Sequence, residues 1–401
     1  MTVLFWLCLA VIVYVYAGYP LGLWLLSRLR PPRPPAVVAG WPWTSLIIAA
    51  YNEESDIREK LVNSLSLSYP REKLEIIVVS DGSTDQTDRI VEGFAPQGVQ
   101  LIRLEGRQGK TAAQNAAAVR AKGDILVFSD ANALYEPDAL QQLVRHFERD
   151  DVGCVEGQRR DFAAVVSASA EHELTYRDWE SLLKTWESRV LSCTGATGPI
   201  YAIRRSLYVP LDPSMISDLM EPMLVMCRHG KRHVFEPGAV SCEVVLPKLQ
   251  DEFRRKVRII TRCLNSLKQA PEVLNPFRCG LFAIQVISHR LLRWLVPVFA
   301  LGAFTATVFL LHHPFYRMIL LLEMLFLFLA HTGAVLDRFD LGPAFLRLPH
   351  YFFTANLASL QAIVNSLLGR NIVNWHTVRS PLGKSQPTRH LAVATGKHEC
   401  A

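Results

Sequence analysis

The sequence predicts an α/β fold, a largely parallel sheet with membrane-spanning helices at both ends of the chain. Between residues 44 and 150, apolar runs rich in β-branched residues alternate with amphipathic segments, as in a parallel sheet. Continuous apolar runs of this kind are typical of strands buried on both faces. We expect strands near 45–50, 74–79, 99–104 and 124–129. We expect the intervening helices near 56–68, 84–94, 110–121 and 137–149.

Long apolar segments at both ends predict membrane spans. Half of the 401 residues are apolar, and the excess is concentrated in a few stretches. Those at 3–26, 291–311 and 316–337 are long enough and poor enough in charge to cross a bilayer. A weaker stretch, 350–368, contains several polar residues and is expected to be re-entrant or buried in a helix bundle. Glu323 is the only acidic residue in the interior of the three strong segments, since Asp337 stands at the very end of the third, so we expect Glu323 to face other helices.

The flanking charges predict the topology. The N-terminal segment lacks a basic leading region, and its apolar part is too long for a signal peptide, so an anchor is expected. Arg28, Arg30 and Arg33 follow it. By the positive-inside rule the N-terminus lies outside and the following domain lies in the cytoplasm. The predicted location is the inner (plasma) membrane, with several spans.

The chain divides into six predicted regions. The Pro-rich region is a stiff spacer, and the basic amphipathic region suits the bilayer surface. The α/β region also contains a long helix near 165–191, a Gly-rich loop at 195–205 that enters another strand, and a helix at 216–230 closed by Gly230. The regions are an anchor (1–27), a Pro-rich spacer (28–43), the α/β domain (44–250), basic interfacial helices (251–290), a C-terminal transmembrane or re-entrant region (291–370) and a tail (371–401).

Charge and cysteine content exclude several classes of protein. A net charge of +6 is modest for 401 residues, so a nucleic-acid partner is not expected. The eight cysteines are scattered and form no CxxC pair. The sequence therefore predicts neither a zinc site nor a disulfide framework, and buried reduced thiols are expected.

The polar residues that end one predicted strand form the strongest candidate site. Parallel sheets bind ligands beyond the carboxyl ends of their strands. Asp130 and Asn132 follow the strand near 124–129 and offer two oxygen ligands two residues apart. Such oxygens suit a hard divalent cation, Mg²⁺ or Mn²⁺, that bridges substrate phosphates. The alternative is that Asp130 caps the following turn and Asn132 supports it.

Other strand ends add polar groups to the same edge. Glu53 and Asp81 follow two neighbouring strands, where carboxylates would accept hydrogen bonds from a nucleoside. For Asp81 the alternative is a turn that leads into a helix N-cap. Lys110 stands at the start of a predicted helix, whose N-terminus favours a phosphate. The chain contains neither P-loop spacing nor GxGxxG, which argues against a dinucleotide cofactor.

Six motifs together give the chain a family resemblance. The segments AAYNEE, VVSDGSTD, QGKTAAQNAA, FSDANALYEPDAL, GPIYAIRRSLY and RRKVRI stand in this order. The chain resembles the membrane-bound bacterial family 2 glycosyltransferases, similar to cellulose, hyaluronan and poly-N-acetylglucosamine synthases, over about residues 44–370. The resemblance implies a GT-A fold (a Rossmann-like nucleotide-binding domain), a nucleotide-sugar donor and inversion at the anomeric carbon.

The resemblance also implies roles for individual residues. Asn52, Glu53 and Asp81 would contact the nucleoside, and Lys110 would contact the nucleotide. Asp130, with Asn132, would bind the diphosphate and the metal. These roles agree with the hypothesis drawn from the strand ends.

Transfer needs one further carboxylate and a cationic group. A metal-neutralised diphosphate leaves readily, so one base suffices to take the proton of the acceptor hydroxyl. Asp218, at the start of the helix near 216–230, is the candidate base, with Glu221 one turn on as the alternative. Arg255 and Arg258 are expected to neutralise the departing diphosphate.

The chain departs from the synthases in two motifs. They have paired acids where this chain has Asp-Leu at 218–219, and they have QxxRW where this chain has RKVRI at 255–259. The aromatic ring that would hold an acceptor sugar is therefore missing. Trp179 and Trp186 could replace it, although packing is the expected role of both.

The sequence thus predicts a membrane-bound inverting glycosyltransferase that uses a UDP-sugar and Mg²⁺ or Mn²⁺. A growing polysaccharide of the cell envelope is the expected acceptor, and single transfer to a lipid-linked acceptor is the alternative. A non-catalytic nucleotide-sugar-binding subunit is a third interpretation, from another class. So few spans are unsuited to forming a channel alone, so a second copy or an export partner is expected.

Overall fold

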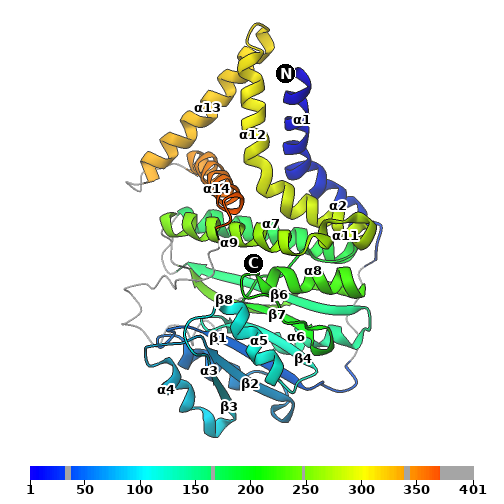
Figure 1. Ribbon diagram of the computed structural model, residues 1–401, viewed down its shortest axis with the longest axis vertical. Helices are drawn as coiled ribbons and strands as arrows, with labels where there is room; N and C mark the ends of the chain where they lie inside the picture. The colour runs from blue at the N-terminus through cyan, green and yellow to red at the C-terminus, as the bar shows by residue number, and fades with distance from the viewer. Residues whose placement is uncertain (32–37, 164–167, 246–248, 338–343, 371–401) are drawn as a thin grey trace, which may run out of the picture.

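In the described residues a mixed sheet of eight strands forms the centre of the molecule, with several apolar helices on one side of it (Figure 1). The computed structural model describes residues 1–31, 38–163, 168–245, 249–337 and 344–370. The strand order is β3-β2-β1-β4-β7-β6-β8-β5. The strands are β1 (Thr44–Ala50), β2 (Leu74–Ser80), β3 (Val99–Arg103), β4 (Ile125–Asp130), β5 (Leu134–Tyr135), β6 (Val152–Ala163), β7 (Ile200–Arg204) and β8 (Arg232–Val245).

The helices also follow the predicted order, with small shifts at their ends. Helices in the sheet region are α3 (Ile57–Leu65), α4 (Thr87–Glu92), α5 (Lys110–Arg120), α6 (Ala139–Val144), α7 (Ala168–Val190) and α8 (Ser217–His229). The remaining helices are α1 (Thr2–Val13), α2 (Tyr19–Arg28), α9 (Leu249–Gln269), α10 (Pro276–Cys279), α11 (Leu281–Val286), α12 (Leu292–Phe309), α13 (Pro314–Asp337) and α14 (Ala344–Leu367).

The parallel part of the sheet confirms the sequence prediction. Strands β1 to β4 lie within one residue of the predicted ranges, and β1 pairs in parallel with both β2 and β4. The strands β1 and β2 are buried along their whole length, as expected for strands covered on both faces. The carboxyl ends of β1, β2 and β4 therefore open at one edge of the sheet.

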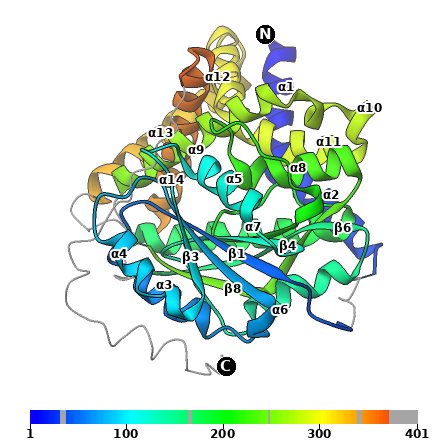
Figure 2. The ribbon, with the colours of Figure 1, turned by 60° about the horizontal axis from the view of Figure 1, so that its bottom comes forward.

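Helices cover both faces of this sheet (Figure 2). Apolar side chains of α3 and α6, such as Leu61 and Leu140, pack on one face. Side chains of α5 and α8, such as Ala117 and Val225, pack on the other. The N-terminus of α5 and that of α8 both lie near the strand ends, which brings Lys110 and Asp218 to the same edge.

The antiparallel part of the sheet was not fully predicted. Strand β7 pairs antiparallel with β4 and β6, and β6 pairs in parallel with β8. The sequence predicted β7 but missed β6 and β8. Strand β6 contains Glu156, Gln158 and Arg159 among its apolar residues, so its pattern lacked a continuous apolar run. Pairing with distant strands, rather than local pattern, forms these two strands.

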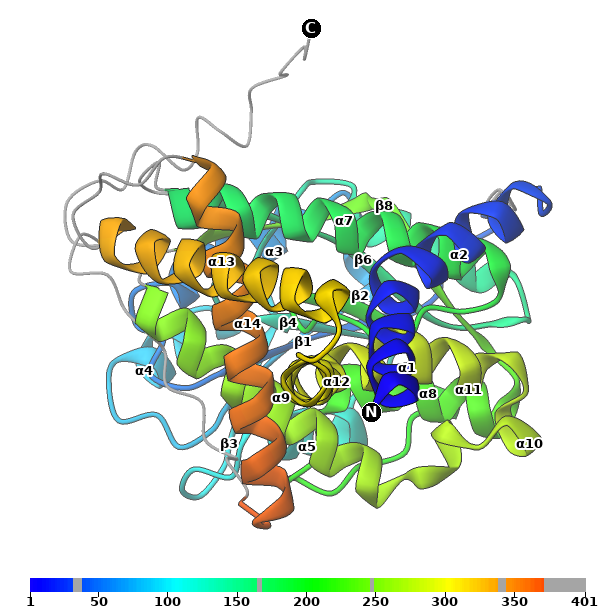
Figure 3. The same cartoon turned by 90° about the horizontal axis from the view of Figure 1, so that it is seen from above.

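Three helical segments among the described residues are long and apolar enough to cross a membrane. They are Thr2–Arg28, Leu281–Phe309 and Pro314–Leu336. Figure 3 shows α1, α12 and α13 on the face opposite the sheet. Glu323 faces another helix, as predicted, because Thr307 Oγ1 on α12 donates to its Oε1 at 3.3 Å.

The weak apolar segment 350–368 lies within α14, which packs along α9. Ser366 Oγ donates to Asn265 Oδ1 at 2.7 Å, and Lys268 Nζ donates to the Ser366 carbonyl at 2.7 Å. These contacts join Ser366, one of the polar residues that distinguish this segment from the three candidate spans, to α9. The spacer residues 32–37 and the tail 371–401 lie outside the described residues.

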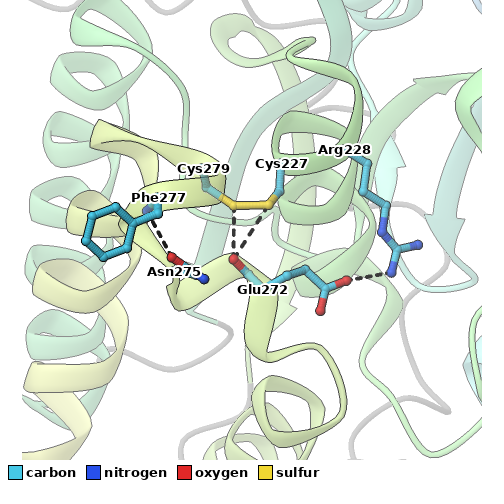
Figure 4. Close-up of a disulfide and its surroundings, with 6 residues drawn as sticks. All are labelled: Cys227, Arg228, Glu272, Asn275, Phe277 and Cys279. Carbon is cyan, nitrogen blue, oxygen red and sulfur yellow. Dashed lines mark hydrogen bonds and ion pairs between the residues drawn. A yellow bond between two sulfur atoms is a disulfide. The ribbon is translucent and has the colours of Figure 1, made fainter.

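A disulfide corrects the prediction of reduced thiols. Cys227, near the end of α8, is bonded to Cys279, at the end of α10, with Cα atoms 4.9 Å apart (Figure 4). Beside it Arg228 pairs with Glu272 at 2.6 Å. The two cysteines are 52 residues apart, and only the packing of α8 against α10 brings them together. Cross-links that close long loops stabilise a fold by about 2–4 kcal/mol. The free and buried cysteines agree with the prediction; they are Cys8, Cys154, Cys193 and Cys263.

Candidate active site

Three charged side chains from distant segments meet at the end of β4. Lys110 Nζ, at the start of α5, pairs with Asp130 Oδ1, at the end of β4. A Cβ placed on Gly198 would lie 2.5 Å from Lys110 Nζ, 2.6 Å from Asp218 Oδ2 and 3.7 Å from Asp130 Oδ2. All three groups therefore surround the backbone of Gly198. Of the residues predicted from the sequence, Lys110, Asp130 and Asp218 form one site.

The glycine at position 198 is required by this arrangement. Any side chain there would occupy the space between the ammonium of Lys110 and the carboxylate of Asp218. The loop is fixed from behind, since Thr197 donates through both its N–H and its Oγ1 to Glu156 Oε1, each at 2.6 Å. Ala196 N–H donates to the Asp218 carbonyl at 2.8 Å. The loop before β7 and the start of α8 thus form one rigid wall of the site.

Burial and the neighbouring charges together shift the pKa values of Asp218 and Lys110. Burial raises the pKa of Asp218, the positive charge of Lys110 opposes the rise, and Asp130 adds to it. Burial alone would lower the pKa of Lys110, but Asp130 and Asp218 outweigh it and raise that pKa. A raised pKa makes the Asp218 carboxylate a stronger proton acceptor than an ordinary aspartate.

The loops after β1 and β2 hold one another. Asn52 adopts a left-handed conformation with φ 53°. Its Oδ1 accepts the Thr84 N–H at 2.7 Å, and its own N–H donates to Ser83 Oγ at 3.1 Å. The Glu53 N–H donates to Thr87 Oγ1 at 2.8 Å, and the Glu53 side chain is buried. These bonds fix the shape of the two loops, and contact of Asn52 and Glu53 with a nucleoside stays a prediction.

Asp81 shapes the loop that precedes α5. Its carboxylate is buried and accepts the N–H groups of Gln108 and Gly109 at 2.7 and 2.9 Å. Burial raises the pKa of Asp81, and these two bonds oppose the rise. Gly82, with φ +71°, approaches the backbone of Gly106 so closely that a Cβ would lie 2.6 Å from its carbonyl oxygen. Asp81 therefore borders the site and orients the segment that leads to Lys110.

Arginines from two segments give the site a positive wall. Arg255, Arg258 and Arg262 lie along α9, and Arg107 lies in the loop before α5. Burial, together with the charges of Arg262, Arg255 and Arg107, lowers the pKa of Arg258 to about 10. Arg262 also interacts with the Asp218 carboxylate. A polyanion such as a diphosphate would relieve the repulsion among these guanidinium groups.

The residues at the end of β4 fit a divalent cation that is shared with a substrate. Asp130 and Asn132 offer hard oxygen ligands, and both reach solvent. No cluster of three or more His, Cys, Asp or Glu that could hold a metal occurs in the described residues. Two protein ligands do not complete an octahedral shell, so phosphate oxygens and water would have to supply the rest. This is the donor set of a site that binds its metal together with a nucleotide.

Glu221, the alternative base, lies in the core on α8. Its Oε2 accepts a hydrogen bond from Tyr201 at 3.0 Å. Burial raises the pKa of Glu221 to about 8. Trp179 and Trp186 pack edge to face on α7, with ring centroids 6.2 Å apart. Neither the glutamate nor the tryptophans are among the side chains around Gly198.

Several residues of the site were not predicted. Gly198, Thr197 and Arg107 lie in loops whose sequence gives no sign of what folds against them. Arg262 could have been found, because it lies four residues after Arg258 on the same helix face. A cavity of about 500 Å³ is lined by Asp124, Phe147 and Arg204 among others and lies at the opposite ends of β4 and β7. It contains none of the site residues.

The chain is similar in sequence to a known protein family and to several known proteins. Residues 45–208 match the family model described as Glycosyl transferase family 2. The poly-beta-1,6-N-acetyl-D-glucosamine synthase of Staphylococcus aureus (strain COL) is 25% identical over 219 residues, 53% of this chain and 53% of that protein. The beta-monoglucosyldiacylglycerol synthase of Nostoc sp. is 28% identical over 163 residues, 40% of this chain and 34% of that protein. The chain spans only about half the length of the curated relatives it matches.

A solved structure resembles nearly the whole chain. The mannosyltransferase of Pyrobaculum calidifontis, in complex with GDP-Man and Mn²⁺, matches with a TM-score of 0.70 and 25% identity. The match covers 92% of this chain and 100% of that one. The mixed sheet is the GT-A type of α/β fold, as the sequence predicted. Residues 45–208, which include Lys110, Asp130 and Gly198, thus form a family 2 glycosyltransferase domain.

Proposed function

We propose that the protein is a membrane-bound, inverting glycosyltransferase that moves a sugar from a nucleoside-diphosphate sugar to a growing glycan. The observation that supports this most strongly is the convergence of Lys110, Asp130 and Asp218 on Gly198, beside the arginines of α9. UDP-sugars are the expected donors, with Mg²⁺ or Mn²⁺. The catalytic domain would face the cytoplasm from the inner membrane, with a second copy or an export partner for a secreted product.

In this proposal the residues on the two sides of the site have different roles, one set toward the donor and the other toward the acceptor. The Asp130 and Asn132 oxygens would hold the cation together with the donor diphosphate. When bound, the cation would neutralise phosphate charge and so make the nucleoside diphosphate a better leaving group. Lys110, Arg258 and Arg262 surround the same space with positive charge. The resident side chains thus favour departure of the negatively charged diphosphate from the anomeric carbon.

Asp218 would act on the acceptor. An acceptor hydroxyl attacks the anomeric carbon from the face opposite the diphosphate, and Asp218 takes its proton. The new C–O bond forms as the bond to the diphosphate oxygen breaks, and that oxygen leaves with the electron pair. A displacement of this kind inverts the anomeric configuration. The pKa of Asp218, raised by burial and by Asp130, suits a general base.

A lipid acceptor is a second candidate, which two observations favour. Position 259 is Ile259, which is 40% exposed, where the polysaccharide synthases have a Trp that holds the acceptor sugar. Helix α9, which carries this residue, packs against α14 next to the predicted spans. One of the similar proteins is named a beta-monoglucosyldiacylglycerol synthase. Single transfer to a lipid would therefore use the same base and the same donor site.

The test uses purified membranes that contain the full chain. These are incubated with radiolabelled UDP-sugars and GDP-mannose, each with Mn²⁺ and with excess chelator, and the product length is read on a gel. We expect metal-dependent transfer from one of the donors. A ladder of products supports a growing glycan, and one organic-soluble product supports the lipid acceptor. Turnover that is unchanged in chelator would contradict the role of Asp130.

Two variants test whether Asp218 or Glu221 is the base. In Asp218→Asn we expect kcat to fall about 10²–10⁴-fold while the donor nucleotide still binds, because only the proton acceptor is removed. Glu221→Gln, on the same helix, is the matched control and should keep its turnover. Full activity in Asp218→Asn together with an inactive Glu221→Gln would show that the base is Glu221.

A further inference from the structure

Lys60 is a lysine buried in the apolar core of the catalytic domain. It lies on α3, and its relative exposure is 0%. The buried face of this helix is formed by Ile57, Lys60, Leu61 and Ser64, so the lysine occupies a position where an amphipathic helix normally has an apolar residue. Burying an ammonium group is costly unless specific partners stabilise it. The Lys60 ammonium therefore requires specific partners within the core.

The partners of Lys60 belong to the segment that follows β4. Its Nζ donates to the Ala133 carbonyl at 2.6 Å and lies 3.9 Å from the centroid of the Tyr135 ring. Burial lowers the pKa of Lys60 to about 7, and the charges of Asp130 and Glu243 oppose this change. The ammonium thus binds a carbonyl and an aromatic face, both of which favour a cation.

A second residue of α3 holds the same segment. Asn63 Nδ2 donates to the Tyr135 carbonyl at 2.8 Å, and the Tyr135 N–H donates to Asn63 Oδ1 at 2.9 Å. Lys60 and Asn63 are one helical turn apart and face the same strand, β5. Helix α3 therefore fixes the chain from Ala133 to Tyr135 at both backbone and side chain.

This segment connects the two walls of the active site. Ala133 lies three residues after Asp130 and directly after Asn132, the expected metal ligands. On the other side, Tyr135 OH donates to the Pro199 carbonyl at 2.9 Å. Pro199 directly follows Gly198, around which Lys110 and Asp218 converge. A shift at Lys60 would therefore be transmitted both to the metal loop and to the loop before β7.

We propose that Lys60 is a positioning residue for catalysis, which holds the Ala133 carbonyl and the Tyr135 ring so that the metal loop and the Gly198 loop keep their spacing. This inference rests on the proposed role of Asp130 and Asn132 in binding the cation with the donor. Lys60 itself touches neither donor nor metal. It acts through the backbone of residues 130–135 and the hydroxyl of Tyr135.

The test separates this role from a purely structural one. Lys60→Met keeps the length of the side chain but removes the charge and the donor. Thr44→Val is the matched control, because it removes a buried polar contact, 3.0 Å to Tyr69 OH, at the opposite end of β1. For each full-length protein in detergent, we would measure the melting midpoint and the binding of Mn²⁺ with UDP or GDP, from the loss of the free-ion EPR signal.

We expect Mn²⁺ binding to be about 10-fold weaker in Lys60→Met, as is typical when a residue that supports metal ligands is removed. Thr44→Val should bind Mn²⁺ as the wild type does, although its melting midpoint also falls. Unchanged Mn²⁺ binding in Lys60→Met, with a lower melting midpoint, would overturn the positioning role while leaving the proposed function intact. Wild-type protein that binds no Mn²⁺ with either nucleotide would overturn both.

Two further variants test the same positioning role if Lys60→Met does not fold. Asn63→Ser removes the side-chain amide that bonds to the Tyr135 backbone, and it changes no charge. It should also weaken Mn²⁺ binding. Tyr135→Phe keeps the ring beneath Lys60 and removes the hydroxyl that donates to the Pro199 carbonyl and, at 3.3 Å, to the Phe128 carbonyl, so it should lower kcat several-fold with Mn²⁺ binding unchanged. Wild-type Mn²⁺ binding in Asn63→Ser, or wild-type kcat in Tyr135→Phe, would contradict the corresponding half of the proposal.

Discussion

Two clusters of charged side chains differ in how completely their charges are paired. In the first, Lys110, Asp130 and Asp218 meet at the strand ends, where the side chains of Lys110 and Asp130 remain 21% and 31% exposed. The second lies where α7 meets the helices toward the membrane. There the carboxylates of Glu180 and Glu187 are almost enclosed by donors.

The second cluster is a closed network. Glu187 Oε1 accepts the Tyr19 hydroxyl at 2.6 Å and pairs with His289 Nδ1 at 2.8 Å. Glu180 pairs with Arg290 and Arg293 at 3.0 and 2.9 Å. Each acid has several donors, and these come from three different helical segments. Such a network orients the helices relative to the catalytic domain and leaves little room for a ligand.

In the first cluster the charges are less completely paired. Its two carboxylates share one nearby ammonium, and the pKa of Asp218 is raised by burial. Carboxylates held together with incomplete pairing store electrostatic free energy that a cation or a proton can release. The arrangement of partners, rather than burial or number of charges, therefore distinguishes the candidate site from the structural network around Glu180 and Glu187.

The largest expected effect comes from opening the closed network. Glu187→Gln removes the charge that pairs with His289, and breaking a buried ion pair costs about 3–5 kcal/mol. We expect the melting midpoint in detergent to fall by roughly 5–10 °C, with turnover of the folded protein retained. An unchanged midpoint combined with lost turnover would mean that this cluster takes part in catalysis, and the comparison would fail.

A smaller effect is expected from filling the open site. Gly198→Ala places a methyl group between Lys110 and Asp218, and displacement of catalytic groups by about 1 Å can cost ~10²-fold in rate. We expect kcat/KM to fall about 100-fold with little change in the melting midpoint. Gly40→Ala is the control, since a Cβ there would have no atom within 4 Å. Wild-type kinetics in Gly198→Ala would show that the space is not used by the reaction.

The smallest effect concerns Glu221, the acid of α8 that belongs to neither cluster. Its pKa rises from 4.5 to about 8 on folding because it is buried. The folded state therefore favours the protonated form, and this contribution to stability is lost as the pH rises from about 4.5 to 8. Glu221→Gln does not ionise, so its melting midpoint should decline less between pH 5 and pH 9 than that of the wild type.

The two proteins should be nearly equal in stability at pH 5 and should diverge as the pH rises. Turnover should be the same in both at pH 7, where Glu221 is mostly protonated and cannot accept a proton. A wild-type midpoint that follows the Glu221→Gln midpoint at every pH would show that this carboxyl is not protonated in the folded state.

The side of the candidate site that contains Asp81, Lys110 and Asp130 was predictable because these residues lie next to predicted strands and helices. Continuous apolar runs identified β1, β2 and β4, and parallel strands must end at a common edge. Asp81 and Asp130 follow from that rule, and Lys110 follows from its place at the N-terminus of a predicted helix. The match to a family 2 glycosyltransferase model extends over the same residues.

The acceptor side depended on contacts between distant parts of the chain. Asp218 and Glu221 are three residues apart, and the sequence left both open as the base. In the structure Asp218 faces Lys110, whereas Glu221 accepts a hydrogen bond from Tyr201 in the core. Likewise, nothing near Cys227 indicates that Cys279 will become its partner.

The sequence by itself determined the α/β class, the edge at which polar groups collect, and the segments suited to a membrane, because each depends on a periodic pattern or a run of residues within one element. The tertiary structure decided which acid of α8 faces the donor site, how β6 and β8 pair, and that the buried Lys60 supports the loop after β4. Each of these depends on which elements pack together, and that packing joins residues far apart in the chain, for which a local pattern carries no information.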